Sequence, residues 1–135
     1  KAGERLAVDQ HRGGRHGVDR LHASDLASEA ARRLAARLKT IVAVTGEVEC
    51  ITDGTRTLAV PGGDAILTRV VGTGCALSAV VAACCALPGD RLQHVASACA
   101  MVARAAAVAV SRSQGPGSFA VAFLDGLWSL NGEEA

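Results

Sequence analysis

The segment Gly72-Thr73-Gly74-Cys75 combines residue types suited to phosphate chemistry, and it stands directly before an alanine-rich apolar run. Two glycines around Thr73 let the backbone turn tightly and approach a ligand closely. An alanine-rich run favours a helix, and the first amides of a helix lack internal partners and carry partial positive charge. We therefore expect a loop that opens into a helix and binds an anion, most often a phosphate.

Cys75 adds a second chemical group at the same place. Helix starts favour the thiolate form of cysteine, and a thiolate can position or remove the proton of an attacking hydroxyl. Phosphoryl transfer to an alcohol needs such a group, together with charge stabilisation on the moving phosphoryl and a metal. The alternative is that Cys75 is a small buried hydrophobic residue.

The segments before this loop are expected to form part of a sheet. Thr40–Thr45 is a β-branched run bounded by Gly46, which is typical of a strand buried on both faces in a parallel sheet. Thr45 ends it at the carboxyl edge, where α/β sheets bind ligands, although its hydroxyl could simply cap a turn. Residues 48–52 and 56–60, joined by Asp53-Gly54, indicate a hairpin.

Helices are expected on either side of these strands. Residues 1–8 are interpreted as a short helical end and residues 9–19 as an exposed loop. Ser24 or Asp25 is expected to cap a helix to about Leu38, with a buried stripe at Leu26, Ala30, Leu34 and Leu38. Three further helices should follow the glycine loop, ending near Leu87, Val110 and Leu130, with Asp90 and Ser118 capping the last two.

Composition bounds the class of protein. Half of the 135 residues are hydrophobic and there is no Tyr, which suits helices packed closely on a sheet. A net charge of +1 gives no electrostatic footprint for nucleic acid. The five cysteines show no zinc spacing, which indicates free thiols in a reducing cytoplasm. The run Ala96–Val110 is interrupted by Arg104 and is too short for a membrane span, and no signal peptide is visible.

A block of strands followed by a block of helices fits two architectures. It can be a small α+β domain or the C-terminal half of a larger α/β domain. So few strands leave an open sheet edge, which favours the half-domain. No linker divides the chain, so residues 1–135 are treated as a single partial domain.

Gly72–Cys75 before an alanine-rich helix resembles the anion-hole signature of ribokinase-like small-molecule kinases, most of which carry aspartate where this chain has Cys75. Two further segments resemble hydroxyethylthiazole kinase in particular. They are residues 44–54, which read VTGEVECITDG, and residues 113–119, which read SQGPGSF and are followed by AFLD at 122–125. The resemblance covers residues 13–130.

The resemblance implies a three-layer ribokinase-like α/β fold and ATP-dependent phosphorylation of 4-methyl-5-(2-hydroxyethyl)thiazole, a salvage step towards thiamine phosphate. Cys75 would position or deprotonate the alcohol, and the amides of Thr73, Gly74 and Cys75 would stabilise the transferring phosphoryl. Thr45 would contact ATP and Gly72 the thiazole. Mg²⁺ would bridge the phosphates.

Glu4 is a candidate metal residue on the same grounds. Ala2-Gly3-Glu4 resembles the end of the family's Asn-x-x-Glu segment, whose glutamate helps hold Mg²⁺ through water, but Lys1 replaces the asparagine. A solvated glutamate is the alternative. The family also implies a homotrimer with active sites between subunits, and further upstream strands. We therefore expect a fragment or a naturally truncated product.

Three other functions are considered. One is a related kinase for hydroxymethylpyrimidine, which residues 44–54 and 113–119 argue against. Another is a remnant that folds or oligomerises without turnover. The last is a cysteine-nucleophile hydrolase, which needs a histidine partner, and His94 is the only histidine in the helical block.

Overall fold

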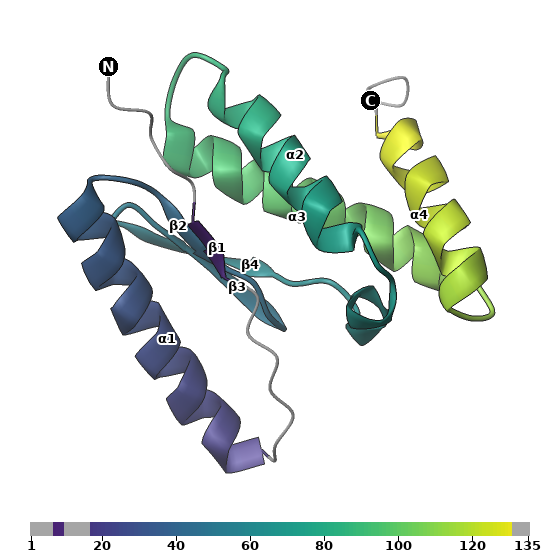
Figure 1. Ribbon diagram of the computed structural model, residues 1–135, viewed down its shortest axis with the longest axis horizontal. Coiled ribbons are helices and arrows are strands. Elements are labelled where there is room, and N and C mark those ends of the chain that lie inside the picture. The colour runs from purple at the N-terminus through teal and green to yellow at the C-terminus, as the bar shows by residue number, and fades with distance from the viewer. Residues whose placement is uncertain (1–6, 10–16, 131–135) are drawn as a thin grey trace.

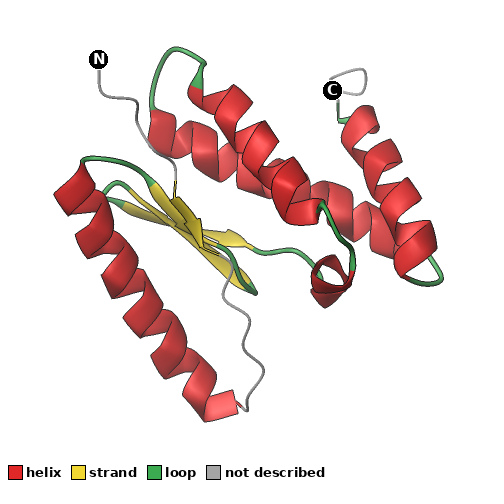
Figure 2. Ribbon diagram, in the orientation of Figure 1, coloured by secondary structure: helices red, strands yellow, loops and turns green. Residues whose placement is uncertain are grey.

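The structure is a computed structural model that describes residues 7–9 and 17–130, with side chains from residue 25 onward. Figure 1 shows α1 on one side of a twisted sheet and the α2–α4 helices on the other, and Figure 2 separates strands from helices by colour. The elements, in chain order, are β1 (Ala7–Asp9), α1 (Gly17–Leu38), β2 (Val42–Val44), β3 (Val48–Thr52), β4 (Thr57–Pro61), the 3-10 helix η1 (Ala65–Arg69), α2 (Thr73–Cys85), α3 (Arg91–Ser111) and α4 (Pro116–Ser129).

The four strands lie in the order β1-β2-β3-β4. β1 pairs with β2 in parallel, whereas β3 and β4 form the predicted hairpin and pair antiparallel. Its turn contains Gly54 at φ 91°, and the Gly54 N–H donates to the Thr52 hydroxyl over 3.0 Å. The fold is therefore α/β, with one parallel strand pair and a following antiparallel hairpin.

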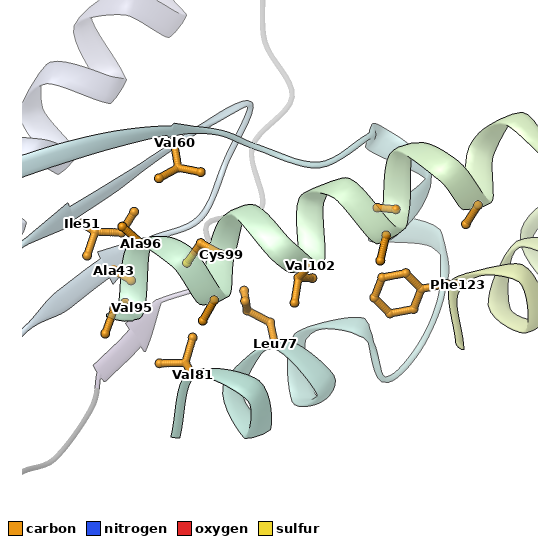
Figure 3. Close-up of a cluster of buried hydrophobic side chains, with 14 of the residues drawn as sticks. Ala43, Ile51, Val60, Leu77, Val81, Val95, Ala96, Cys99, Val102 and Phe123 are labelled. Carbon is orange, nitrogen blue, oxygen red and sulfur yellow. The ribbon is translucent and has the colours of Figure 1, made fainter. Parts of the chain in front are cut away.

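β2 is buried on both faces, as its sequence predicts. Ala43 lies in the main core with Ile51 of β3, and Figure 3 shows both beside the residues of α3. Val42 packs on the opposite face against Ala31 and Ala35 of α1. One short strand thus joins two hydrophobic clusters.

The central helix of the core is α3. Its buried residues include Leu92, Val95, Cys99, Val102 and Ala106, which pack in one cluster with residues of the sheet, α2 and α4. Figure 3 labels Val95, Cys99 and Val102 of this helix in the cluster. By length and composition α3 is long and apolar enough to cross a membrane. It is the one helix within the described part of the chain that meets this criterion. The packing of α3 against the sheet, α2 and α4 accounts for the same apolar composition.

The expected stripe on α1 is wrong except at Leu34, which is half-buried against the cluster of Ala31, Ala35 and Val42. Ala31 and Ala35 are buried, whereas Leu26 is 73% exposed and Leu38 is 52% exposed. The reason is close packing: a Cβ added to Gly54 would lie 2.6 Å from the backbone nitrogen of Ala36. Only small side chains allow the helix to approach the sheet and the hairpin this closely.

Several expected boundaries also differ. Residues 7–9 form a strand rather than a helical end, and α1 begins at Gly17, inside the segment expected to be a loop. α4 begins at Pro116 rather than after Ser118, because proline suits the first helical position. The Ser118 hydroxyl instead accepts the Gln114 N–H over 2.9 Å. The Asp90 cap is confirmed, since its carboxylate accepts the Leu92 N–H.

Candidate active site

The start of α2 has the backbone geometry of an anion site. Gly72 caps the helix in the left-handed region, at φ 100° and ψ −14°, with no side-chain cap. The first intrahelical hydrogen bond runs from the Ala76 N–H to the Gly72 carbonyl over 2.9 Å. The amides of Thr73, Gly74 and Cys75 precede that bond and share the positive end of the helix dipole. This is the arrangement that the sequence predicts.

Thr73 holds this helix start in place through its side chain. Its hydroxyl lies 3.0 Å from the Leu67 carbonyl and 3.2 Å from the Val70 carbonyl, and can donate to either. The hydroxyl therefore ties the first turn of α2 back to η1 and the loop that follows it. The side chain of Thr73 therefore holds the helix start in place, and its backbone amide stays among those that precede the first helical hydrogen bond.

Cys75 is exposed at the first turn of α2. This exposure contradicts the alternative that it is a buried packing residue. The other four cysteines are half-buried or buried, and all five are free thiols. Cys75 is thus the one cysteine placed both at a helix start and in contact with solvent.

Thr45 lies at the same end of the sheet as the start of α2. It directly follows β2, and β3 begins at Val48, which pairs with the last residue of β4, Pro61. From Pro61 the chain passes through η1 to Gly72, and in Figure 1 η1 follows β4 and leads into α2. The topology therefore brings Thr45 and the Gly72–Cys75 loop to one edge.

Two glycines allow tight packing at this edge. The Gly62 N–H donates to the Glu47 carbonyl over 2.9 Å, and a Cβ on Gly62 would collide with the Gly46 carbonyl. A Cβ on Gly63 would collide with the Leu67 side chain in η1. The loop after β4 is thereby packed against the loop after β2 on one side and against η1 on the other.

A groove of about 280 Å³ opens beside Gly62. Its walls are the end of β4 and one face of α3, and Arg104 is the only charged residue among them. The lining residues are Val60, Pro61, Gly62, Ala100, Ala103, Arg104 and Ala107. The groove is therefore a largely apolar surface with one cationic side chain in its lining.

Sequence reasoning missed this groove. Some alanines of α3 let a neighbouring helix approach closely, as Ala105 does, whose carbonyl would lie 3.1 Å from a Cβ on Gly126 of α4. The usable signal was the spacing of Ala100, Ala103 and Ala107, which places three small side chains on one face. That face of α3 lines the groove rather than packing against another helix.

A buried acid, also unforeseen, lies between sheet and helix. Glu49 on β3 is 7% exposed, and its carboxyl interacts with the Cys99 thiol of α3. Burial raises the pKa of Glu49, and burial followed by the neighbouring Glu49 raises the pKa of Cys99. Within the described side chains, Glu49 Oε2 has no hydrogen-bond partner. Cys99 is therefore a packing thiol with a polar neighbour.

The described residues do not supply a metal site. No three His, Cys, Asp or Glu side chains converge among them, and Glu4 lies outside this part of the chain. The structure therefore presents a helix start whose first amides precede the first helical hydrogen bond, together with an exposed thiol, an adjoining strand end and an apolar groove.

Comparison with known proteins identifies the family. The profile of the hydroxyethylthiazole kinase family matches residues 1–133. Hydroxyethylthiazole kinase of Cronobacter sakazakii is 62% identical over 126 residues, which cover 93% of this chain and 48% of that protein. The Citrobacter koseri enzyme is 56% identical, over 98% of this chain and 51% of its own length. The chain spans about half the length of these relatives.

Solved structures give the same result. Hydroxyethylthiazole kinase from Pyrococcus horikoshii superposes with a TM-score of 0.75 at 35% identity, over 84% of this chain and 44% of that one. Bacillus subtilis YxkO superposes with a TM-score of 0.56 at 20% identity, which shows likeness of fold alone. With its profile match across nearly the whole sequence, this chain belongs to the hydroxyethylthiazole kinase family.

Proposed function

We propose that this chain carries the phosphoryl-transfer site of a kinase that phosphorylates the hydroxyl of 4-methyl-5-(2-hydroxyethyl)thiazole with ATP. The observation that carries the proposal is the start of α2, where Gly72 turns the backbone so that three amides precede the first helical hydrogen bond. Such amides stabilise charge on a moving phosphoryl group without reorganisation. The names of the relatives supply the thiazole alcohol as substrate.

Each site residue has a distinct part in this proposal. The amides of Thr73, Gly74 and Cys75 bind the transferring phosphoryl. The exposed Cys75 thiol positions the substrate hydroxyl and accepts its proton. Gly72 precedes Cys75 by three residues and takes the thiazole ring beside it, because the space around its Cα is open, with nothing within 4 Å of an added Cβ.

The nucleotide is assigned to the neighbouring part of the same edge. Thr45, at the end of β2, contacts the phosphates or ribose of ATP. The groove of about 280 Å³ takes the purine base, because its alanine walls are flat and apolar and Arg104 can stack on an aromatic ring. Gly62 connects the groove with Thr45, because it lines the groove and packs on the loop that follows Thr45.

Mg²⁺ is proposed to accompany ATP, because phosphoryl transfer generally uses a metal to neutralise the phosphates. The described residues offer no ligand set for it. Glu4 remains a candidate outside them. We also propose that the full kinase is a cytoplasmic homotrimer in the thiamine pathway whose partners are small molecules rather than nucleic acid or membranes.

The test is a phosphoryl-transfer assay with ATP, Mg²⁺ and the thiazole alcohol, followed by mass detection of the phosphate ester. The chain is assayed alone and after mixing with the remaining half of the Cronobacter sakazakii enzyme. Cys75→Ala should lower kcat at least tenfold, which corresponds to about 1.4 kcal/mol. Cys84→Ala, in the same helix but half-buried, should leave kcat unchanged.

A Cys75→Ala variant as active as the parent chain would overturn the role of the thiol. Preference for hydroxymethylpyrimidine in a competition assay would reassign the substrate. Absence of turnover in both arms would favour a non-catalytic remnant, which is the second candidate because the chain spans half of its relatives.

A further inference from the structure

The buried carboxyl of Glu49 lies between the two parts of the site to which the nucleotide is assigned. Val44 of β2 pairs with Cys50 of β3, so the same register continued by one residue brings Thr45 opposite Glu49. On its other side Glu49 pairs with Val60 of β4, which lines the groove. Residues directly opposite each other on antiparallel strands share one face of the sheet. Glu49 therefore connects the strand end at Thr45 with one wall of the groove.

The helix across from Glu49 forms the other wall of the groove. The carboxyl of Glu49 interacts with the Cys99 thiol of α3. Ala103 lies one turn further along the same face of α3 and lines the groove. Figure 3 shows Val60 on β4 and Cys99 on α3 as members of one cluster. The interaction between Glu49 and Cys99 thus joins the strands behind one wall to the helix that forms the other.

The Glu49 side chain is enclosed behind these walls. Glu49 is 7% exposed, and the residues that line the groove do not include it. Its Oε2 atom is buried with no hydrogen-bond partner among the described side chains. A buried carboxyl with an unpartnered oxygen is far less costly with its proton than as an anion, because nothing there replaces the lost water. The packing at this point therefore favours the neutral acid.

The described elements packed around Glu49 bring no cation to its carboxyl. The groups that face it are the Cys99 thiol from α3, Val60 from β4 and Thr45 from the end of β2. The charged residues of the same region are Glu47, before β3, and Arg104, in the groove lining, and both are exposed. Burial raises the pKa of Glu49, and the smaller effect of the Cys99 thiol lowers it. Geometry and charge thus act together to keep the proton on Glu49.

Loss of this proton would act on the nucleotide site in one direction. A carboxylate at Glu49 needs water, which can enter only by separating β3 and β4 from α3. The carboxylate also places a negative charge on the same face as Thr45, where the phosphates or ribose of ATP are assigned, and like charges repel. Both effects weaken the binding of ATP.

We propose that Glu49 is a positioning residue of the nucleotide site, which as a neutral acid holds the strand end at Thr45 and both walls of the groove together. Ionisation of Glu49 then makes ATP binding weaken as the pH rises. The inference rests on the assignment of ATP to Thr45 and the groove in the proposed function. It adds a residue that acts through its neighbours and touches no reacting atom.

The first test needs only the chain itself. The chain is labelled with ¹³C and ¹⁵N and titrated by NMR from pH 4 to pH 9. We expect the amide resonances of Thr45 and Ala103 to shift with the same midpoint as the side-chain carboxyl carbon of Glu49. In Glu49→Gln, which keeps the shape of the side chain but cannot ionise, these two shifts should vanish. Amides that do not follow the Glu49 midpoint would overturn the positioning role, whatever the phosphorylation assay shows.

The second test measures ATP binding. Isothermal titration calorimetry gives the Kd of ATP with Mg²⁺ for the chain mixed with the remaining half of the Cronobacter sakazakii enzyme. The ratio of the parent Kd to the Glu49→Gln Kd cancels the titration of ATP itself, and it should rise at least threefold between pH 5 and pH 9. Glu29→Gln removes a carboxyl from α1, on the other side of the sheet in Figure 1, and should follow the parent at every pH.

The outcomes separate this inference from the assignment of the nucleotide. A ratio that stays flat while ATP binds measurably would overturn the role of Glu49 and leave the nucleotide assignment intact. A rising ratio in which Glu29→Gln departs from the parent as Glu49→Gln does would also overturn it, because the effect would then come from net charge. Absence of ATP binding in the parent and in Glu49→Gln would overturn the proposed function, and this inference with it.

Discussion

The hydroxyl of Thr73, the first residue of α2, lies 3.0 Å from the carbonyl oxygen of Leu67 in η1. This hydrogen bond fixes the helix start against the segment that arrives from β4. The amides that follow Gly72 are consequently held by a side chain that points away from the anion they would bind. In Thr73, the side-chain hydroxyl positions the helix start, whereas the backbone amide would bind the anion.

Replacing Thr73 separates these two contributions. Thr73→Val removes the hydroxyl while keeping the amide and the shape, so one hydrogen bond worth about 1 kcal/mol is lost. We expect kcat/KM in the reconstituted phosphorylation assay to fall severalfold. Thr73→Ser keeps the hydroxyl and should recover most of the activity. Full activity in Thr73→Val together with a loss in Thr73→Ser would show that the methyl group, rather than the hydrogen bond, matters.

Two glycines with positive φ should respond differently to alanine. Gly54→Ala places a Cβ 2.6 Å from the Ala36 backbone in addition to its backbone strain at φ 91°. We expect a loss of about 2–4 kcal/mol in the free energy of unfolding. Gly72→Ala meets no atom within 4 Å, so it should cost only about 1–2 kcal/mol, from strain alone. Urea unfolding of both variants measures the difference.

The same pair tests the site. Gly72→Ala should lower turnover strongly because it misaligns the first amides of α2, whereas folded Gly54→Ala protein should keep its turnover. If Gly72→Ala is fully active, the left-handed cap is a turn requirement with no part in phosphoryl transfer.

The groove on α3 gives a prediction about the nucleotide. Ala103→Leu fills the space between β4 and α3 with a branched side chain. We expect the KM for ATP to rise about tenfold, or about 1.4 kcal/mol, with the KM for the thiazole alcohol unchanged. Ala30→Leu on the exposed face of α1 is the control. A selective rise in the KM for the alcohol would move the substrate, rather than the base, into the groove.

Local signals were enough to predict the site loop. Gly72, the helix after it and the Asp90 cap depend on residues next to each other in sequence, and the structure contains all three. The face of α1 could not be predicted in this way, because Ala31 and Ala35 are selected by how closely the hairpin approaches. Leucine outranks alanine in any count of hydrophobic periodicity, and here the contact needed the smaller residue.

The buried acid illustrates the same limit on a strand. β3 alternates Val48, Cys50 and Thr52 on one face with Glu49 and Ile51 on the other. The pairing of Ile51 with Ala43 turns the second face towards α3, and Glu49 must follow it. Val48 is left 62% exposed. A pattern of period two cannot tell which face is inward when both carry apolar residues.

This burial predicts an unusual dependence of stability on pH. The pKa of Glu49 is raised in the fold above its ordinary value of 4.5 by burial, so the folded protein binds the proton more tightly than the unfolded chain. The resulting stabilisation is complete below pH 4.5 and is lost as the pH rises through the folded pKa. Relative to Glu49→Gln, the parent chain should therefore lose free energy of unfolding as pH increases from 4.5.

Glu29→Gln is the matched control for this effect. Hydrogen bonds from Arg32 and then Arg33 lower the pKa of Glu29, so its contribution is present above its ordinary value and is lost as the pH falls. Urea unfolding between pH 2.5 and 8 should give opposite slopes for the two differences, below pH 4.5 for Glu29 and above it for Glu49. A Glu49→Gln difference that is flat across this range would show that the carboxyl is solvated in the folded chain.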